Sequence, residues 1–381
     1  MIQFLQPLDT QKLRMAFNND IIRFYSNNAI PALSCRIYDT FQKINVTLYP
    51  NPQGQFYFNF KPYVSALINT RNFNDTLQTN IMGYEPDSFI YNFSQGTFTQ
   101  RNITFEIYYE NNTTESVSFV LSWLAGVQQP GSFHNFRISD MLILSPFVKD
   151  SANRYYLKYW KGYPFDIPFY SNGINLKVKN ETNLLSMDFN TLGYGERLVV
   201  SDGRTNVTLE DILPLSDGHN NLVFMKGNQP SINDKYLMLE KSDHTKGVYL
   251  KWLNAMGGYN YWLFENTYSI DRSTKQLGEI NTDFNNIDST FGRTATLGKE
   301  SQDTIKVVAE LLNEDERAIV QGILDSPKIY LFTGRPYAQN DYNDWVEVTL
   351  KTGNARIKNA RQPLTNFIFD LELPQRYTQT L

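Results

Sequence analysis

The sequence predicts a mainly β protein: two consecutive β-sandwich-like domains, followed by a small α+β C-terminal domain with a helix pair. Three observations lead to this prediction. Apolar residues recur at every second position through most of the chain, which is the spacing of a half-buried strand. Tight-turn dipeptides interrupt these stretches at Asn172-Gly173, Asp202-Gly203 and Asp217-Gly218. Only residues 305–327 show convincing helical spacing.

The first domain is predicted at residues 1–125 and contains two hairpins, with turns at residues 39–43 and 110–115. Residues 62–70, between the hairpins, are expected to form one or two helical turns. Residues 125–135, rich in Gly, Pro and Gln, are the predicted linker. The alternating apolar residues of the hairpins are Leu33, Cys35 and Ile37 with Ile44, Val46 and Leu48, and then Ile103, Phe105 and Ile107 with Val117, Phe119 and Leu121.

The second domain is predicted at residues 140–253 and begins with an aromatic stretch at residues 154–170. The hairpin at its end has apolar residues on both faces, so we expect it to be buried on both faces or packed against another subunit. Gly257-Gly258 lie in its turn. Its apolar residues are Val248, Leu250 and Trp252 before the turn, with Tyr259, Tyr261 and Leu263 on one face and Trp262 and Phe264 on the other after it.

The third domain is predicted at residues 254–381. Its helix pair rests on two apolar stripes at helical spacing, the first made by Ile305, Val308, Leu311 and Leu312, the second by Ile319, Val320, Ile323 and Leu324. Asn313 and Glu316 have the spacing of a capping box at the start of the second helix. Strands are expected at residues 328–334, 345–351 and 366–373.

Composition narrows the class of protein. The chain has 381 residues, 35 Lys and Arg against 39 Asp and Glu, a net charge of −4, and 41% hydrophobic residues. This is enough apolar material for real cores, which excludes wholesale disorder. The charge balance is near neutral and slightly acidic, so it does not indicate binding to duplex nucleic acid or to an anionic membrane. We therefore expect no specific nucleic-acid partner.

The amino terminus has no basic segment followed by an apolar one, so we expect no secretory signal. No run approaches the ~18 apolar residues of a membrane span. We expect a soluble protein that is made in a cytoplasm and does not insert into a membrane.

The sequence offers few cysteine and histidine residues for catalysis or metal binding. Cys35 is the single cysteine, which excludes an intrachain disulfide and a cysteine-built zinc site. Its place on the apolar face of a strand predicts a buried structural cysteine rather than a nucleophile. The three histidines, His134, His219 and His244, lie far apart in sequence.

Enzymatic motifs are missing: there is no phosphate-binding loop, dinucleotide fingerprint, metalloprotease helix or nucleophile elbow. Paired carboxylates could still support glycoside hydrolysis. However, acidic residues beside aromatic ones in a β protein usually solvate hairpin loops, so we expect no catalytic residue and no enzymatic activity. The acidic residues close to aromatic ones are Asp166, Asp188, Asp341 and Asp344.

Two Asx-rich loops could offer oxygens to calcium. Neither has the glycine and terminal glutamate spacing of the twelve-residue calcium loop, so ordinary Asx turns, no metal and no cofactor are expected. The oxygen-bearing residues are Asp283, Asn285 and Asp288 in one loop and Asp341, Asn343 and Glu347 in the other.

Tyr and Trp gather at residues 155–160 and 259–262, and two uses of these rings remain open. Carbohydrate or base stacking is one. However, nucleic-acid platforms interleave aromatic residues with Lys and Arg, which residues 259–264 lack. Packing within the fold or across protomers is favoured, since stable interfaces are enriched in Tyr and Trp. The predicted packing anchors are Trp252, Tyr259, Tyr261, Trp262 and Trp345.

Several segments resemble virion structural proteins of tailed bacteriophages, in particular tail-tip or baseplate components. They are GVYLKWLNAMGGYNYWLFEN (residues 247–266), residues 297–334, NDWVEVTLK (343–351), FIFDLELPQRYTQTL (367–381) and the amino-terminal INVTLYPNPQGQFYFNFKPYVSALI (44–68). The resemblance implies a distal-tail or baseplate-hub protein of the virion, assembled in the host cytoplasm. Such a protein forms a ring with copies of itself and joins other tail or baseplate proteins.

Two alternatives to a ring or hub component stay open, with glycan hydrolysis as a distant further one. The first is a receptor- or carbohydrate-binding β-sandwich tail protein, in which exposed Tyr and Trp rings stack on glycan of the host surface. The second is a bacterial cell-surface adhesin, against which the absence of a secretory signal argues.

Overall fold

Strands dominate the chain and the helices are short, which confirms the predicted mainly β fold class. The chain forms two compact units, and the predicted division into three domains stays a prediction. The first unit is Met1–Asp243 with Leu253–Asn260, and the second is His244–Trp252 with Tyr261–Leu381. The computed structural model describes residues 1–93, 96–146, 153–173, 175–191, 193–227, 231, 233–265, 268–281, 294–337, 344–358 and 362–380.

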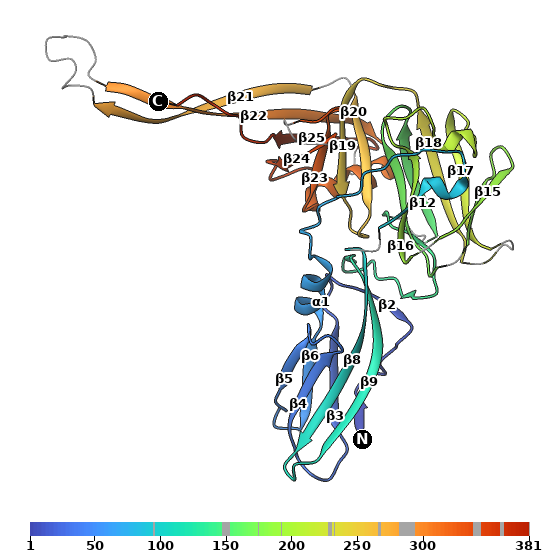
Figure 1. The fold of residues 1–381 in the computed structure, drawn as a ribbon, viewed down its shortest axis with the longest axis vertical. Coiled ribbons are helices and arrows are strands. Elements are labelled where there is room, and N and C mark those ends of the chain that lie inside the picture. Colours follow the sequence, from blue (N-terminus) through green and yellow to red (C-terminus); the bar gives the residue numbers. More distant parts are fainter. Residues whose placement is uncertain are drawn as a thin grey trace. The chain divides into compact units, whose positions relative to one another are not determined.

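The amino-terminal part of the first unit has a three-stranded and a six-stranded sheet. The strands are β1 (Ile2–Phe4), β2 (Lys12–Met15), β3 (Ile21–Ser26), β4 (Ala32–Asp39), β5 (Asn45–Leu48), β6 (Gln55–Asn59), β8 (Phe98–Tyr109), β9 (Thr114–Leu124) and β10 (Phe136–Arg137). Their orders are β1-β3-β6 and β10-β2-β9-β8-β4-β5. Both predicted hairpins are confirmed, because β4 pairs with β5 and β8 with β9 (Figure 1).

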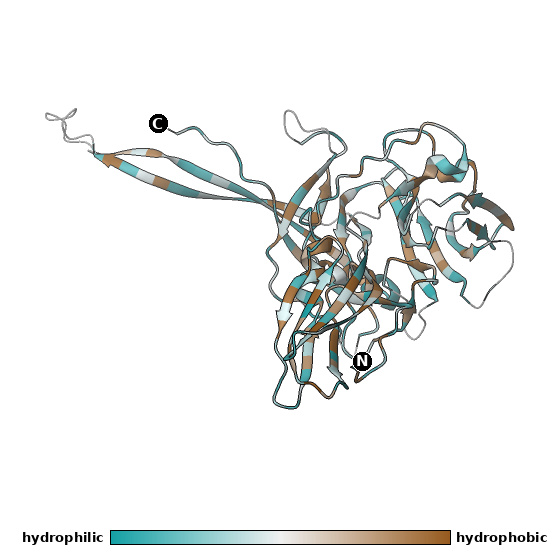
Figure 2. Cartoon of the chain, turned by 60° about the horizontal axis from the view of Figure 1, so that its bottom comes forward, coloured by the Kyte–Doolittle hydropathy of each residue, from teal (hydrophilic) through white to brown (hydrophobic). Residues whose placement is uncertain are grey.

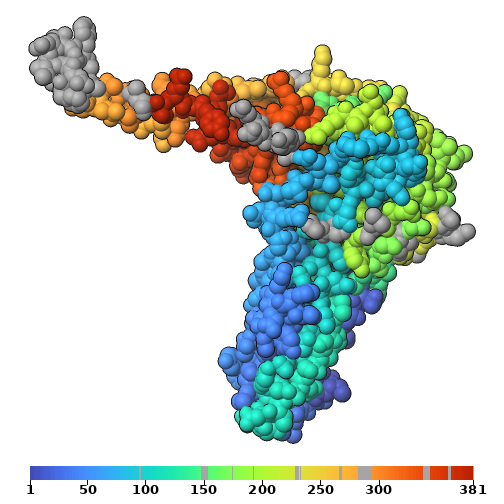
Figure 3. All heavy atoms as spheres, in the orientation of Figure 1, coloured from blue at the N-terminus to red at the C-terminus, as the bar shows by residue number. Residues whose placement is uncertain are grey.

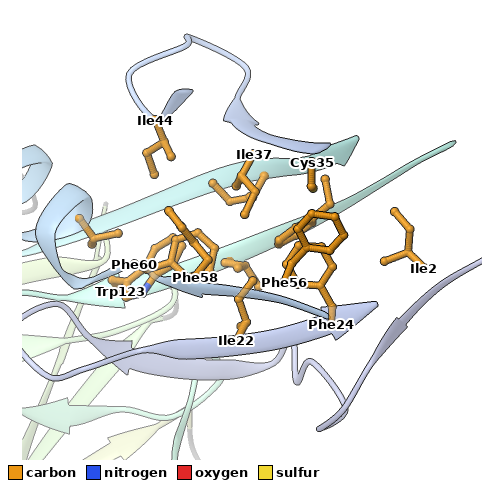
Figure 4. Packing of buried hydrophobic residues seen from close by; sticks show 14 of the residues in the cluster. Ile2, Ile22, Phe24, Cys35, Ile37, Ile44, Phe56, Phe58, Phe60 and Trp123 are labelled. Carbon is orange, nitrogen blue, oxygen red and sulfur yellow. The ribbon is translucent and has the colours of Figure 1, made fainter. Parts of the chain in front are cut away.

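The apolar faces of these two sheets share one core. Figure 4 shows Phe24 and Phe56 of the smaller sheet beside Cys35 and Ile37 of the larger one. The rings of Phe24 and Phe56 stack with their centroids 5.2 Å apart. Period-two alternation thus produces a β-sandwich, since each strand contributes every second side chain to the shared interior.

The short helix α1 (Lys61–Ile68) confirms the helical turns expected between the hairpins. A proline is tolerated in its first turn, because the backbone N–H groups of a first turn have no acceptor within the helix. Val64 and Ile68, four residues apart, are both buried and belong to the core of the sandwich. The helix therefore closes one part of this core.

The second β region belongs to the same unit and has two further sheets, ordered β11-β13-β16-β7 and β12-β18-β17-β14-β15. The ring of Tyr159 on β12 lies 5.4 Å from that of Phe165 on β13, so the two sheets meet through aromatic contacts. The elements are η1 (Pro86–Phe89), β7 (Ile90–Asn92), β11 (Leu142–Ile143), β12 (Arg154–Trp160), β13 (Phe165–Tyr170), β14 (Leu176–Asn180), β15 (Leu185–Phe189), β16 (Gly195–Ser201), η2 (Leu209–Asp211), β17 (Gly218–Lys226) and β18 (Lys235–Ser242).

The predicted tight turns of this region contain glycines in the left-handed backbone region. Gly203, with φ of 70°, follows Asp202 directly after β16. A Cβ atom on Gly203 would lie 2.9 Å from the backbone nitrogen of Pro164. Only glycine satisfies both this backbone angle and the close approach of the neighbouring segment.

The second unit is built on a seven-stranded sheet with the order β20-β19-β23-β24-β25-β22-β21. Strands expected at residues 328–334, 345–351 and 366–373 are confirmed as β23, β24 and β25. β19 and β20 are buried along nearly their whole length, as predicted for the closing hairpin. The elements are β19 (Gly247–Leu253), β20 (Tyr259–Glu265), β21 (Tyr268–Asn281), β22 (Thr294–Leu312), α2 (Glu314–Val320), η4 (Gln321–Asp325), β23 (Ile329–Phe332), β24 (Trp345–Leu350) and β25 (Thr365–Glu372).

The helix predicted from Ile305 to Leu312 is wrong, because these residues belong to β22. Ile305 and Val307 are buried at period two and stand opposite Leu371 and Phe369 of β25. The apolar-rich run at residues 305–312 fits both the helical period of 3.6 residues and the strand period of two. The β-branched residues of this run favour a strand, and pairing with β25 gives them a packed surface.

The second predicted helix is confirmed as α2, followed directly by the 3-10 helix η4. Asn313 Oδ1 accepts hydrogen bonds of 2.9 Å from the backbone nitrogens of Asp315 and Glu316. Glu316 Oε2 accepts one of 3.0 Å from the nitrogen of Asn313, which completes the capping box. No helix in the described ranges has the length and apolarity needed to span a membrane.

Candidate interaction surfaces

The five predicted anchors do not form one site. Trp252, Tyr259, Tyr261 and Trp262 are buried inside the chain, and Trp345 is half-buried. These side chains therefore pack within the fold, while a contact across protomers stays a prediction. Three different environments hold Trp252, Tyr259, Tyr261 and Trp345, while Trp262 is a buried residue of β20.

The first environment is an aromatic cluster in the second unit, made by Tyr249, Tyr261, Phe332 and Trp345. The ring centroids of Tyr249 lie 6.0 Å from Tyr261 and 5.9 Å from Trp345, and those of Phe332 and Trp345 are 5.1 Å apart. Such edge and offset contacts between rings add stability beyond simple burial.

A buried lysine completes the aromatic cluster. Lys251 Nζ lies 4.4 Å from the ring centroid of Trp345 and 5.1 Å from that of Tyr330. A cation over ring faces is strongly attracted when water is excluded. The sequence analysis did not predict this role for Lys251. The signal that could have predicted it is a single Lys within a strand that is apolar on both faces.

Trp252 occupies the second environment. Its side chain is fully buried. A Cβ atom built on Gly322 would lie 3.4 Å from the Nε1 atom of Trp252, so the indole lies next to Gly322. Gly322 belongs to η4, so Trp252 joins the sheet to this helix. Its buried Nε1 has no hydrogen-bond acceptor among the described residues.

Tyr259 belongs to the third environment; it is the first residue of β20 and is counted with the first unit, which includes Leu253–Asn260. Its ring and that of Phe93 enclose the guanidinium of Arg197, whose Cζ lies 4.5 Å and 3.9 Å from the two centroids. The hydroxyl of Tyr259 donates a hydrogen bond of 3.2 Å to the carbonyl oxygen of Phe73. Tyr259 therefore binds both a buried cation and the irregular segment that contains Phe73.

Arg197 is itself 2% exposed and holds two carboxylates. Its Nη1 and Nη2 donate hydrogen bonds of 3.0 Å to the two carboxylate oxygens of Asp75, and Nη1 lies 3.6 Å from Asp166 Oδ2. This Arg197 cluster borders a cleft of about 410 Å³ that Asp75, Phe93 and Tyr259 line. A bidentate arginine and carboxylate pair fixes geometry as well as charge.

The acidic residues considered for glycoside hydrolysis take structural positions where they are described. Asp166 contacts Arg197, and Asp188 is exposed on β15 with its Oδ1 3.9 Å from Lys177 Nζ. Asp344 is buried, and its carbonyl oxygen accepts a hydrogen bond from the hydroxyl of Thr333. Asp341 lies outside the described residues.

The first Asx-rich loop, with Asp283, Asn285 and Asp288, lies outside the described residues. Of the second loop, Asp341 and Asn343 lie outside them as well, while Glu347 forms an ion pair of 2.7 Å with Lys328. Within the described ranges, no group of three or more His, Cys, Asp and Glu side chains could hold a metal ion.

A long pair of strands, β21 and β22, lies at one edge of the seven-stranded sheet. β21 pairs with β22 from Tyr268 opposite Val307 to Asn281 opposite Thr294. β25 pairs with β22 only as far as Thr304. Beyond that point the two strands form a ribbon with an open outer edge on β21, and Figure 1 shows them running past the neighbouring strands.

Apolar side chains on this hairpin face solvent. Tyr268 and Ile270 are 53% and 57% exposed, although they lie opposite the buried Val307 and Ile305. The apolar stripe of the sheet therefore continues onto β21, where no described residue covers it. Figure 2 shows brown, hydrophobic residues along a hairpin that is otherwise teal and white.

The carboxyl-terminal residues run along the other edge of the ribbon. The backbone nitrogen of Leu373 donates to the carbonyl oxygen of Asp303 at 3.0 Å, and Thr380 forms an isolated bridge with Gly298. Figure 3 shows these red residues against the orange hairpin. Among the described strands, none pairs with the outer edge of β21.

No protein-family profile matches this chain, and no curated protein matches it. Solved structures give distant similarities. The fibronectin(III)-like modules of Clostridium thermocellum CbhA match with 7% identity over 65% of this chain and 99% of theirs, at a TM-score of 0.20. A tetra-tandem repeat from the extending region of a large adhesion protein matches with 10% identity over 81% and 69%, at 0.23. A Ca²⁺-stabilised adhesin of an Antarctic bacterium matches with 8% identity over 79% and 66%, at 0.16. Similarity at this level supports no inference about function.

Proposed function

We propose that this protein is a non-enzymatic structural component of a phage tail, in the distal tail or the baseplate. In this role it assembles with copies of itself into a ring and connects the tail to adhesion or receptor-binding proteins. The observation that carries the proposal is the hairpin of β21 and β22, with its open edge and its uncovered Tyr268 and Ile270.

An open strand edge is a template for another chain, because its N–H and C=O groups lack partners. A two-stranded ribbon is only marginally stable alone in water. Burial of its exposed apolar side chains on association contributes further favourable free energy. A ring of identical subunits uses this kind of surface, since each subunit offers one patch to the next.

The resemblance to tailed-phage virion proteins supports the same proposal from the sequence. Its segments at residues 247–266 and 297–334 contain β19, β20 and much of β22. The resemblance thus covers the hairpin strand that stands next to the open edge. On this proposal the protein belongs to the virion and assembles in the host cytoplasm.

The mass of the purified full chain, measured by multi-angle light scattering across a dilution series, tests self-assembly. We expect a discrete oligomer that Tyr268→Ser/Ile270→Ser converts to monomer. Val120→Ser/Leu184→Ser, which also removes two exposed apolar side chains, is the matched control and should leave the oligomer intact. A monomer at every concentration, or equal loss in the control, would contradict the proposal.

Receptor or carbohydrate binding is the second candidate, and a specific surface favours it. Tyr49 and Tyr57 of the amino-terminal sandwich are 78% and 53% exposed, and both line a hollow of about 390 Å³ with Asn51 and Gln55. Exposed rings beside amide side chains can pack on a sugar face and bond its hydroxyl groups. Titration of the full chain with neutral and acidic polysaccharides tests this candidate, and no binding of any of them would overturn it.

A further inference from the structure

A basic cleft adjoins the tyrosine hollow on the amino-terminal sandwich. Its volume is about 690 Å³. Its charged lining consists of Lys12, Arg14, Arg23 and Arg137 with Asp9 and Asp20. Cations therefore exceed carboxylates locally, in a chain whose net charge is −4. A concave surface with an excess of one charge concentrates ligands of the opposite sign.

The acidic side chains of the cleft are already engaged. Asp20 Oδ2 lies 3.4 Å from Arg14 Nε and accepts a hydrogen bond of 2.9 Å from Trp123 Nε1. Asp9 Oδ1 accepts one of 2.9 Å from the backbone nitrogen of Gln11. These contacts leave the carboxylates in fixed positions.

Three cations of the cleft have no such partner. Lys12, Arg23 and Arg137 are exposed and form no ion pair within the described residues. Arg14, by contrast, is buried and donates to the carbonyl oxygens of Lys12 and Asp9 at 3.1 Å and 2.7 Å. The cleft thus has a rigid wall and a set of unpaired cations.

Arg23 joins the basic cleft to the tyrosine hollow, because it lines both. It stands opposite Tyr57 in the pairing of β3 with β6, and its Cζ lies 6.0 Å from the centroid of the Tyr57 ring. Buried Ile22 and Phe24 flank Arg23 on β3, which places Arg23 on the outer face of the sheet. A ligand on Tyr57 would therefore reach the cations.

From this geometry we infer that the amino-terminal sandwich binds an acidic carbohydrate. The sugar rings pack on Tyr49 and Tyr57, and carboxylate or sulfate groups are held by Arg23, Arg137 and Lys12. Arginine presents a planar fork of donors that matches such oxyanions. This inference rests on the second candidate function, carbohydrate binding, and specifies the class of sugar.

Titration calorimetry of the full chain with three polysaccharides tests the inference. The probes are polygalacturonate (carboxylates), dextran sulfate (sulfate esters) and neutral dextran. We expect at least one acidic polysaccharide to bind at least about tenfold more tightly than dextran, and added salt to weaken its binding. The stronger of the two acidic probes identifies the acidic group.

Arg23→Gln/Arg137→Gln should remove the preference for acidic over neutral polysaccharide, while Tyr57→Ala should weaken both. Arg356→Gln/Lys358→Gln removes two exposed positive charges from the second unit and should change nothing. Unchanged thermal unfolding of each variant shows that the fold is retained. An equal loss of the preference for acidic polysaccharide in this control variant would overturn the inference.

Three further outcomes are decisive. Dextran binding as tightly as the acidic probes would overturn the acidic specificity and leave carbohydrate binding standing. No binding of any polysaccharide would overturn both. Polyglutamate binding as tightly as polygalacturonate would assign the cleft to acidic peptides and overturn the carbohydrate proposal.

Discussion

Asp303 Oδ1 accepts a hydrogen bond of 2.7 Å from Arg272 Nε, across the paired strands β22 and β21. The other oxygen, Oδ2, accepts one of 2.9 Å from Nη1 of Arg376 in the carboxyl-terminal segment. One carboxylate therefore ties β22 to its neighbours on both sides. The hydrogen bond from Arg272 is the main cause that lowers the pKa of Asp303.

Asp303→Asn should loosen the carboxyl-terminal segment from the hairpin, because the neutral amide loses the charge that holds Arg376. We expect trypsin to cleave after Arg376 several-fold faster than in the unaltered protein, as measured by intact mass over time. Asp271→Asn, which removes a neighbouring charge on β21, is the control. Equal cleavage rates in all three proteins would contradict the role given to Asp303.

Acid should loosen the same segment. The folded pKa of Asp303 lies below the ordinary value of 3.8, so the stabilisation is fully present above that value and is lost as pH falls through the folded pKa. We expect hydrogen-exchange protection of the Leu373 amide, corrected for intrinsic rates, to hold down to about pH 5 and to fall below pH 3.8. A fall of the same size in Asp303→Asn would show that another group is responsible.

Arg197→Met should strongly destabilise the first unit, because it leaves the buried Asp75 carboxylate beside Asp166 without its counter-ion. Breaking one side of a buried ion pair typically costs about 3–5 kcal/mol. Urea unfolding followed by tyrosine and tryptophan fluorescence measures the loss.

Lys177→Met is the matched control, since it breaks the exposed pair with Asp188. We expect a change of less than about 1 kcal/mol there. A loss of that small size in Arg197→Met would mean that the Arg197 cluster contributes no more than a surface pair.

Period-two patterning was enough to predict the fold class and the main hairpins, because strand alternation is local information. It failed at Ile305, where an apolar-rich run fits both periods and only pairing with Phe369 and Leu371 decides. The contact of Arg197 with Asp75 joins residues 122 positions apart, which no local pattern predicts.

The candidate surfaces were harder to predict than the fold. The anchors were chosen for residue type, and four of the five proved buried. The exposed Tyr268 and Ile270 were missed, because exposure on an edge strand depends on which strands cover it. The basic cleft combines β2 and β10, which are neighbours in one sheet, with β3 of the other sheet, so the packing of the two sheets sets their proximity.

Trp262→Ala should destabilise the second unit, since the indole is 4% exposed and its removal leaves a cavity. Truncating a buried Trp to Ala typically costs about 3–5 kcal/mol. Ile357→Ala, at an exposed position of the same unit, should change the unfolding free energy by no more than about 0.5 kcal/mol. Similar values for both variants in urea titrations would show that Trp262 is not a packing anchor.

Cys35 should resist alkylation in the native protein. The side chain is fully buried in the sandwich core, and burial is the main cause that raises the pKa of its thiol to about 12. At pH 8 only roughly one thiol in ten thousand is ionised, and the thiolate is the reactive form. We expect iodoacetamide to label Cys35 fully in guanidinium chloride and negligibly in buffer, as measured by intact mass. Cys35→Ala should stay folded with a modest loss of stability, as befits a small core residue. Rapid labelling of the native protein would instead show an accessible thiolate, which contradicts a purely structural cysteine.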